Sequence, residues 1–268
     1  MFKLSNMSFA YEKNNMLFSD INVDLRKGET LSILGPNGVG KTTFLKCMMG
    51  FLKPTRGEVF IEGKRVKEIG QKDFWKKVSY VPQAKQVNFP YTVLEMVLLG
   101  RASSIGFTSK PSKKDRELAL KALDTVGMLK LKDKDTSRIS GGELQLVLIA
   151  RAIVSNPEIM VLDEPESNLD MRNQIIVLDV LEKLKSEKKL TTIVNTHYPN
   201  HAFKIAEKSL IMGYDGSHQI GDTESVINRE NIKKYFQVDS HFLEVKSNEG
   251  SKGHRVLFPT DISSLKDI

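Results

Sequence analysis

One stretch of the sequence combines glycines, a lysine and hydroxyl side chains at the spacing that binds phosphate. It follows the pattern G-x-x-x-x-G-K-[ST]. Its glycines let backbone N–H groups turn toward phosphate oxygens, Lys41 reaches the β- and γ-phosphates, and the Thr42 hydroxyl coordinates Mg²⁺. A chance match in a chain of this length has odds on the order of 1%. The predicted phosphate-binding loop consists of Gly35, Pro36, Asn37, Gly38, Val39, Gly40, Lys41, Thr42 and Thr43.

Two acidic residues, Asp163 and Glu164, end the apolar run that begins at Ile159. A strand that runs into an acidic turn is common by itself. Downstream of a phosphate loop, a metal role is favoured, in which Asp163 holds the Mg²⁺ that Thr42 also binds. Glu164 is then placed to orient or deprotonate the attacking water.

A second glycine-bearing stretch runs from Ile139 to Glu143. Ser140 and Glu143 have the spacing of a capping box, so an ordinary helix start is one interpretation. The paired Gly141 and Gly142 lower helix stability by roughly 1 kcal/mol each relative to Ala, yet they bare the N–H groups of the first turn, which bind anions. Because the first loop already holds one phosphate group, this second site suggests a second subunit.

The elements that must position these residues can be read from hydrophobic periodicity. Ile21, Val23 and Leu25 alternate with polar residues, which predicts a half-buried antiparallel strand. Further strands, buried on both faces of a mostly parallel sheet, are predicted at Thr30–Leu34, Val78–Val81, Ile159–Leu162, Thr191–Asn195 and Leu210–Met212. The first of these runs directly into the phosphate loop, and an apolar helical run follows the loop.

The stretch between Val81 and Ile159 has the pattern of helices. Capping boxes are predicted at Thr92–Glu95 and Ser112–Asp115, and the second opens an apolar stripe that stops at Gly127. We therefore expect a core of residues 1–83 and 158–236 that carries a helical subdomain of about 84–157. An amphipathic helix is expected around Val177–Leu184, and the C-terminal extension, 237–268, is expected to form a β-hairpin.

Composition narrows the class of protein further. The chain has 268 residues, a formal charge of +7 and 40% hydrophobic residues, so disordered and fibrous classes are excluded. A single cysteine, Cys47, excludes a disulfide scaffold and a cysteine-rich metal site. We expect no signal peptide at the start and no membrane span. The lysines of Lys110–Arg116 and Glu182–Lys189 are interpreted as solvated helix faces, with a lipid- or nucleic-acid-facing surface as the alternative.

Taken in order, these motifs resemble the nucleotide-binding subunit of an ABC transporter from about Leu4 to Phe236. The resemblance implies an α/β fold: a P-loop NTPase (RecA-like) core with an antiparallel β subdomain and an inserted helical subdomain. It also implies that Tyr11 stacks on adenine and that Gln83 senses the metal and γ-phosphate. Ser167–Asp170 is similar to the loop that crosses to the partner, and His197 to the histidine that contacts the γ-phosphate. The departures from the family pattern are Ile139, Glu143, Leu144 and Leu146.

The resemblance implies an ATPase that works as a homodimer with Mg²⁺. Each ATP lies between Gly35–Thr43 of one chain and Ser140, Gly141, Gly142 and Glu143 of the other. A groove around Gln83 and Phe89–Tyr91 receives a helix of a transmembrane permease, so the chain acts as a peripheral protein on the cytoplasmic face of the membrane. Nucleic acid is not an expected partner.

Within the family, Val81–Arg101 resembles importers of iron–siderophore complexes, haem and cobalamin, which also use an extracytoplasmic solute-binding protein. The alternatives are an oxyanion importer, a soluble ABC ATPase that acts on nucleic acid or ribosomes, and a non-hydrolysing scaffold.

Overall fold

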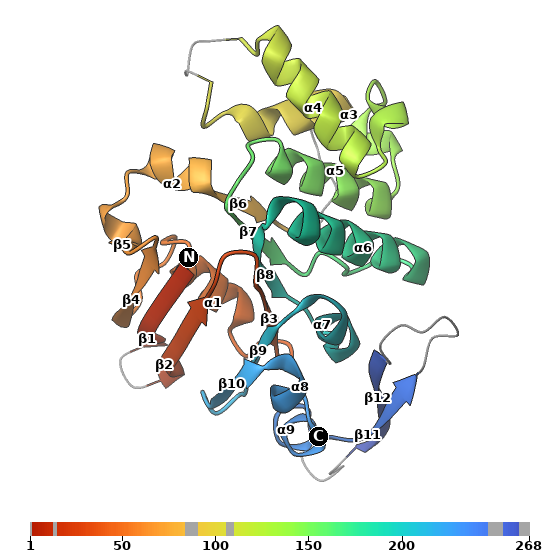
Figure 1. Ribbon diagram of the computed structural model, residues 1–268. Helices are drawn as coiled ribbons and strands as arrows, with labels where there is room; N and C mark the ends of the chain where they lie inside the picture. Colours follow the sequence, from red (N-terminus) through yellow and green to blue (C-terminus); the bar gives the residue numbers. More distant parts are fainter. Residues whose placement is uncertain (1, 13–14, 84–90, 106–109, 246–253, 263–268) are drawn as a thin grey trace. The chain divides into compact units, whose positions relative to one another are not determined.

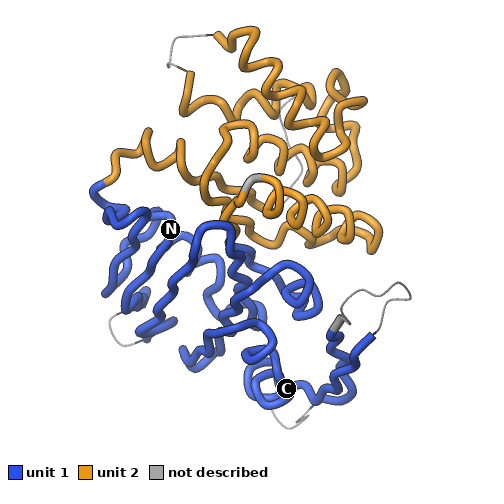
Figure 2. The backbone as a smooth tube through the Cα atoms, in the orientation of Figure 1, with its two compact units in different colours: residues 1–68, 193–268 blue, residues 69–192 orange. Residues whose placement is uncertain are grey.

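The computed structural model describes residues 2–12, 15–83, 91–105, 110–245 and 254–262. The chain divides into two compact units (Figure 2), of which unit 1 comprises residues 1–68 and 193–268 and unit 2 comprises residues 69–192. Strand β8, Thr191–Asn195, crosses the boundary between them. The predicted limits of the helical subdomain, about 84–157, stay a prediction.

Unit 1 begins with a four-stranded antiparallel sheet in the order β2-β1-β4-β5 (Figure 1). In β2, the side chains of Ile21, Val23 and Leu25 are buried and those of Asn22 and Asp24 are exposed, because alternate residues of a strand point to opposite faces. The predicted half-buried antiparallel strand is confirmed. The strands are β1 Phe2–Glu12, β2 Asn15–Leu25, β4 Arg56–Ile61 and β5 Lys64–Arg65.

The second part of unit 1 is built on parallel strands. Strand β3, Thr30–Leu34, pairs in parallel with β9, Lys208–Met212, and β10, His218–Asp222, joins β9 in antiparallel register. Every residue of β3 is buried, as expected for a strand covered on both faces. The helices of unit 1 are α1 Lys41–Met48, α7 Pro199–Ile205, α8 Thr223–Val226 and α9 Arg229–Phe236, with the 3₁₀ turn η1 Val66–Glu68.

The C-terminal part of unit 1 is a hairpin of β11, Val238–Val245, and β12, His254–Ile262. The hairpin is held against α7 by Asn200, whose Nδ2 donates to the Leu257 carbonyl at 3.1 Å and whose Oδ1 accepts from the Leu257 N–H at 2.7 Å. Arg255 lies over the rings of Phe203 and Phe242. The predicted hairpin is confirmed, and it is a packed part of unit 1.

Unit 2 contains one parallel pair of strands, β6 Val78–Val81 and β7 Ile159–Asp163. Between these strands the described residues form helices and a single isolated bridge, Thr92 to Asp135, which confirms the helical insertion. The helices are α2 Gln71–Lys77, α3 Val93–Leu98, α4 Lys113–Thr125, α5 Gly141–Ile153 and α6 Met171–Lys188, with 3₁₀ turns η2 Leu99–Arg101, η3 Leu129–Leu131 and η4 Thr136–Arg138.

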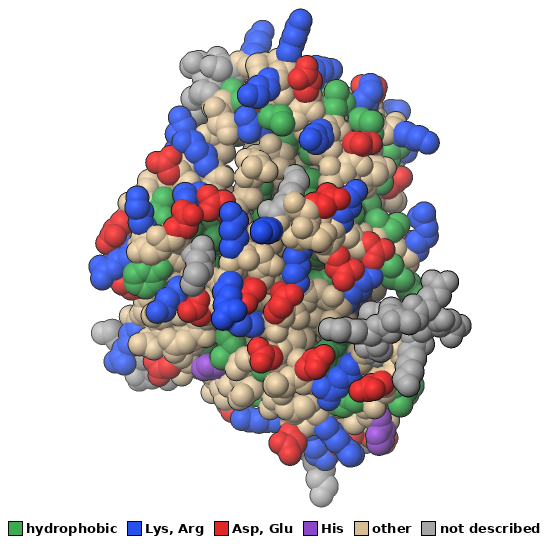
Figure 3. Space-filling model, viewed as in Figure 1, with side chains coloured by type: hydrophobic (Ala, Val, Ile, Leu, Met, Phe, Trp, Pro, Cys, Tyr) green, Lys and Arg blue, Asp and Glu red, His purple; other side chains and the backbone are tan. Residues whose placement is uncertain are grey.

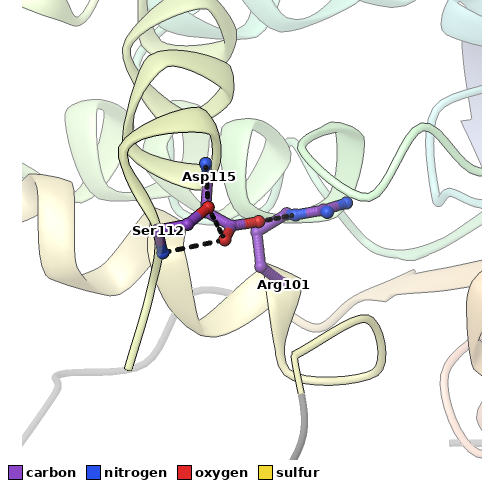
Figure 4. Close-up of polar contacts among 3 residues, drawn as sticks. All are labelled: Arg101, Ser112 and Asp115. Atoms are coloured by element: carbon purple, nitrogen blue, oxygen red, sulfur yellow. Dashed lines mark hydrogen bonds and ion pairs between the residues drawn. The ribbon is translucent and has the colours of Figure 1, made fainter. Parts of the chain in front are cut away.

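Three helices of unit 2 start with a complete capping box, at Thr92, Ser112 and Ser140, as predicted. The box of α4 carries an additional ion pair, shown in Figure 4. Asp115 accepts hydrogen bonds from the Ser112 N–H and hydroxyl, and its other oxygen lies 2.9 Å from Nε of Arg101. This fixes the start of α4 to the end of η2.

On the face drawn in Figure 3, acidic and basic side chains are interspersed over most of the area. The lysines of the α4 segment, Lys110, Lys113 and Lys114, are exposed. Among the described residues, no helix has the length and apolar content needed to cross a bilayer.

Candidate nucleotide-binding site

The phosphate loop of unit 1 lies between the end of β3 and the start of α1. Gly35 has a φ of 144°, and a Cβ at this position would lie 2.5 Å from the Met212 carbonyl oxygen of β9. Gly40 has a φ of 101° and occupies the N-cap position of α1 without a side-chain cap. Glycine is therefore required for close packing at one end of the loop, and it leaves the helix N-terminus open to an anion at the other.

Lys41 is enclosed by the loop that it follows. Its side chain is only 5% exposed, and Nζ donates to the carbonyl oxygens of Gly35 at 2.7 Å and Pro36 at 2.8 Å. The ammonium group thus occupies the centre of the loop. A bound phosphate has to compete with these two carbonyls for the lysine, and a charged acceptor competes well.

Tyr11 on β1 lies beside the first turn of α1. Its hydroxyl is 3.0 Å from Oγ1 of Thr43, its ring packs edge-on against Phe9, and the side chain is 69% exposed. An exposed aromatic ring next to the phosphate loop is suited to stack on a base. The sequence-predicted Tyr11 and Thr43 are therefore brought together.

His197 follows strand β8. The neighbouring Thr196 donates its N–H to the Ile33 carbonyl at 3.0 Å. This bond places His197 beyond the end of β3 from which the phosphate loop departs. In unit 1, Tyr11 therefore lies beside the start of α1, and His197 lies near the end of β3, where the phosphate loop begins.

In unit 2, the acidic pair stands at the end of β7. Asp163 is buried, and one of its carboxylate oxygens accepts from the Tyr80 hydroxyl at 3.3 Å. Burial and the nearby carboxylate both raise the pKa of Tyr80, which therefore stays a hydrogen-bond donor. Glu164 has a φ of 50° and accepts from the Ser167 hydroxyl at 3.0 Å.

Gln83 lies at the same edge of unit 2 as this acidic pair. Val81 of β6 is in register with Leu162 of β7, so Gln83 and Glu164 each stand two residues beyond a paired position. The predicted groove around Gln83 and Phe89–Tyr91 lies in part outside the described residues, since these omit 84–90.

The two glycines at the start of α5 differ in the space that surrounds them. A Cβ on Gly142 would lie 2.5 Å from the side-chain amide of Asn173 on α6, whereas a Cβ on Gly141 would meet nothing within 4 Å. Asn173 is itself tied to Asp170 by two hydrogen bonds. The predicted role of the two glycines in baring the helix N-terminus stays a prediction, and Gly142 also lies where a Cβ would clash with Asn173.

Sequence reasoning missed two tyrosines that touch motif residues. Tyr80 bonds Asp163, and Tyr214, in the turn between β9 and β10, donates to the Asn37 carbonyl at 2.9 Å. Neither carries a local signal, because each contact joins residues far apart in the chain.

Unit 2 also holds a pocket of about 800 Å³ beside η2. Its wall includes the apolar side chains of Trp75, Leu99 and Ile105. Arg151 lines it too. Its guanidinium donates to the Met96 sulfur at 3.8 Å, and burial lowers the pKa of Arg151. A pocket with an apolar wall and a guanidinium suits a peptide segment with an apolar and an acidic side chain.

Comparison with known proteins places these motifs in a family. A family model described as ABC transporter matches residues 18–167. A molybdate import ATP-binding protein of Haemophilus influenzae is 35% identical over 94% of each chain. A probable iron chelatin transport ATP-binding protein of Helicobacter pylori is 32% identical over 78% of this chain and 85% of the relative.

Solved structures of ABC transporter proteins are also similar to this chain. An inward-facing structure of a putative metal-chelate type ABC transporter has a TM-score of 0.85 at 33% identity and covers 97% of both chains. A dimeric ATP-binding cassette in a post-hydrolysis state, bound to ADP and phosphate, has a TM-score of 0.70 at 29% identity and covers 83% of this chain and 99% of that one. The motifs, the fold and these matches lead to one conclusion: the chain belongs to the ABC transporter family, and it is an ATPase with the P-loop α/β fold of an ATP-binding cassette.

Proposed function

We propose that the chain is the ATP-hydrolysing subunit of an ABC importer for a metal chelate of the iron–siderophore, haem or cobalamin type. The observation that carries the proposal is the likeness to a metal-chelate type transporter over 97% of the chain, which includes the C-terminal hairpin. The iron chelatin relative supports the same solute class.

The proposed chemistry gives each predicted site residue a role toward the nucleotide. Lys41 exchanges the Gly35 and Pro36 carbonyls for the β- and γ-phosphates, and the N–H groups of the loop hold the phosphate oxygens. Tyr11 stacks on the adenine. Glu164, fixed by the Ser167 hydroxyl, orients the attacking water, and His197 contacts the γ-phosphate.

The residues proposed to hold Mg²⁺ are Thr42, Gln83 and Asp163. They offer a hydroxyl, an amide oxygen and a carboxylate, which is an all-oxygen set of the kind that Mg²⁺ prefers. Tyr80 donates to one oxygen of Asp163 and so orients the carboxylate. The bound ion would neutralise charge that develops on the phosphates.

The proposed active form is a dimer in which Ser140, Gly141, Gly142 and Glu143 of one chain close over the nucleotide of the other. The free space around Gly141, in the first turn of α5, supports this role. The dimeric cassette with 29% identity supports it as well.

We further propose that a cytoplasmic segment of a transmembrane permease docks in the pocket beside η2. Leu99 is 45% exposed on its wall, and Arg151 supplies a partly buried positive charge. We propose accordingly that the chain works on the cytoplasmic face of a membrane as a peripheral protein, and that an extracytoplasmic binding protein supplies the solute.

A second candidate is an oxyanion importer. The molybdate import relative, which covers 94% of the chain at 35% identity, favours it. A role on nucleic acid is not what we propose, and on the face drawn in Figure 3 acidic and basic side chains are interspersed.

The test is ATPase activity of the chain reconstituted with the permease that co-purifies with it and with the solute-binding protein of that permease. Ferric siderophore, haem, cobalamin and molybdate are offered in turn to the binding protein. We expect one of the metal chelates to stimulate ATP hydrolysis and to accumulate inside vesicles. Stimulation by molybdate alone would replace the chelate proposal by the oxyanion candidate. Co-purification with RNA, in place of a permease, would overturn both.

A further inference from the structure

Three successive carbonyl groups of the phosphate loop accept hydrogen bonds from side chains. Lys41 donates to the carbonyl oxygens of Gly35 and Pro36. Tyr214 donates to the carbonyl oxygen of Asn37 at 2.9 Å. We expect the two donors to behave differently when a nucleotide binds. Lys41 is the residue that has to turn to the phosphates, whereas Tyr214 comes from outside the loop and can keep its bond.

The bond to Asn37 fixes a peptide group that has two accessible orientations. Asn37 and Gly38 form a turn in which Gly38 has a φ of 84°, as at the third residue of a type II turn. Rotation of the central peptide converts type II to type I, and glycine tolerates either sign of φ. Because N–H and C=O of a trans peptide point in opposite directions, the Asn37 carbonyl sets the direction of the Gly38 N–H.

Tyr214 is held in place by the turn that carries it. Gly213 and Ser217 are joined by a backbone hydrogen bond of 2.9 Å, and Asp215 accepts from the N–H and the hydroxyl of Ser217 at 3.0 and 2.6 Å. The end of β9, which leads into this turn, touches the loop at a second point, where the Met212 carbonyl packs on Gly35. The donor is therefore fixed before any ligand arrives.

We propose that Tyr214 is a positioning residue for ATP binding: its hydroxyl holds the Asn37–Gly38 peptide so that the Gly38 N–H points into the phosphate-binding concavity. A loop that flips between two orientations binds only in one of them, and its apparent affinity falls by the fraction that is competent. Tyr214 raises that fraction in the free protein. The role concerns nucleotide binding and does not depend on the transported solute.

The test is titration of the full chain with ADP and Mg²⁺, together with steady-state ATPase kinetics. Tyr214→Phe removes only the donor, so we expect about twofold to tenfold weaker ADP binding, the range of one neutral hydrogen bond. KM for ATP should rise by the same factor. The kcat at saturating ATP should stay within about twofold, because the bound nucleotide itself then holds the peptide. Since Tyr214 is 69% exposed, the unfolding midpoint without nucleotide should stay within about 1 °C.

Two further variants separate positioning from other roles. Tyr198→Phe removes the hydroxyl of another exposed tyrosine in unit 1 and should bind ADP as the unmodified chain does. Tyr214→Ala should weaken binding about as much as Tyr214→Phe. Normal binding by Tyr214→Phe with weak binding by Tyr214→Ala would mean that the ring only covers the loop, and it would overturn the proposal. So would a fall in kcat at unchanged KM.

Discussion

Glu164 combines a left-handed backbone conformation with a carboxylate held by a neighbour. A φ of 50° at a non-glycine residue is disfavoured, and the Ser167 hydroxyl bonds the carboxylate at 3.0 Å. Such local strain persists where the surrounding structure fixes it, and it is found often at active sites. The geometry at this residue supports a carboxylate set up to orient water.

We predict that Glu164→Gln lowers ATP turnover by at least about 100-fold, because the amide cannot accept a proton, while ATP binding stays within about threefold. Steady-state phosphate release and ATP titration measure the two quantities. The same substitution at the exposed Glu187 of α6 is the control and should leave turnover unchanged. Normal turnover by Glu164→Gln would show that another group is the base.

At the scale of elements, two helices of unit 2 start with the same kind of capping box, and we assign the two boxes different purposes. At α4 it fixes a helix start, and at α5 it fixes a helix start that we propose also meets a phosphate. A matched pair of serine substitutions can separate these purposes.

We expect Ser112→Ala and Ser140→Ala each to destabilise the protein by about 1 kcal/mol through loss of the cap. This corresponds to roughly 2–4 °C in the unfolding midpoint. Only Ser140→Ala should also lower ATPase activity, by about tenfold or more. Thermal unfolding and phosphate release give the two readings. If both variants lost the same amount of ATPase activity, Ser140 would act only as a helix cap, and the proposed phosphate contact would be wrong.

The ion pair at the start of α4 predicts a pH dependence. Hydrogen bonds from Ser112, together with Arg101, lower the pKa of Asp115 from 3.8 to about 2. A depressed carboxyl pKa stabilises the fold above the unfolded-state pKa, and the stabilisation is lost as the pH falls through the folded-state value. The stability difference between the unmodified chain and Asp115→Asn should therefore be constant above about pH 5 and shrink between about pH 4 and 2. Denaturant unfolding across this range measures it. A difference that does not change with pH would contradict the assignment.

At the scale of the whole molecule, the dimer proposal requires the phosphate loop of one chain to face the start of α5 in another. The chain allows this to be tested by crosslinking. Its only cysteine, Cys47, is 1% exposed, and burial raises its pKa to about 12, so it does not react with thiol reagents. Asn37 is exposed, and Gly141 has free space for a side chain.

We predict that Asn37→Cys and Gly141→Cys, combined in the Glu164→Gln background, form a crosslinked dimer with a short bifunctional thiol reagent when ATP and Mg²⁺ are present. Denaturing electrophoresis detects it. Each single-cysteine variant is a control and should give little product. Equal crosslinking with and without ATP, or none with it, would refute the proposed arrangement.

The sequence by itself determined the features whose signals are local. Strands β3, β6 and β8 have the predicted limits, the three capping boxes form where predicted, and the hairpin is present. These features follow from periodicity and from contacts three residues apart, which a short window of sequence contains.

Only the tertiary structure decided which distant groups shape the loop. Tyr214 reaches Asn37 across 177 residues, Met212 limits Gly35 to glycine, and Asn173 does the same for Gly142. Contacts of this kind leave no period in the sequence, because they depend on which elements the fold brings side by side. The sequence could therefore predict the phosphate loop, but not the side chain that we propose holds it ready.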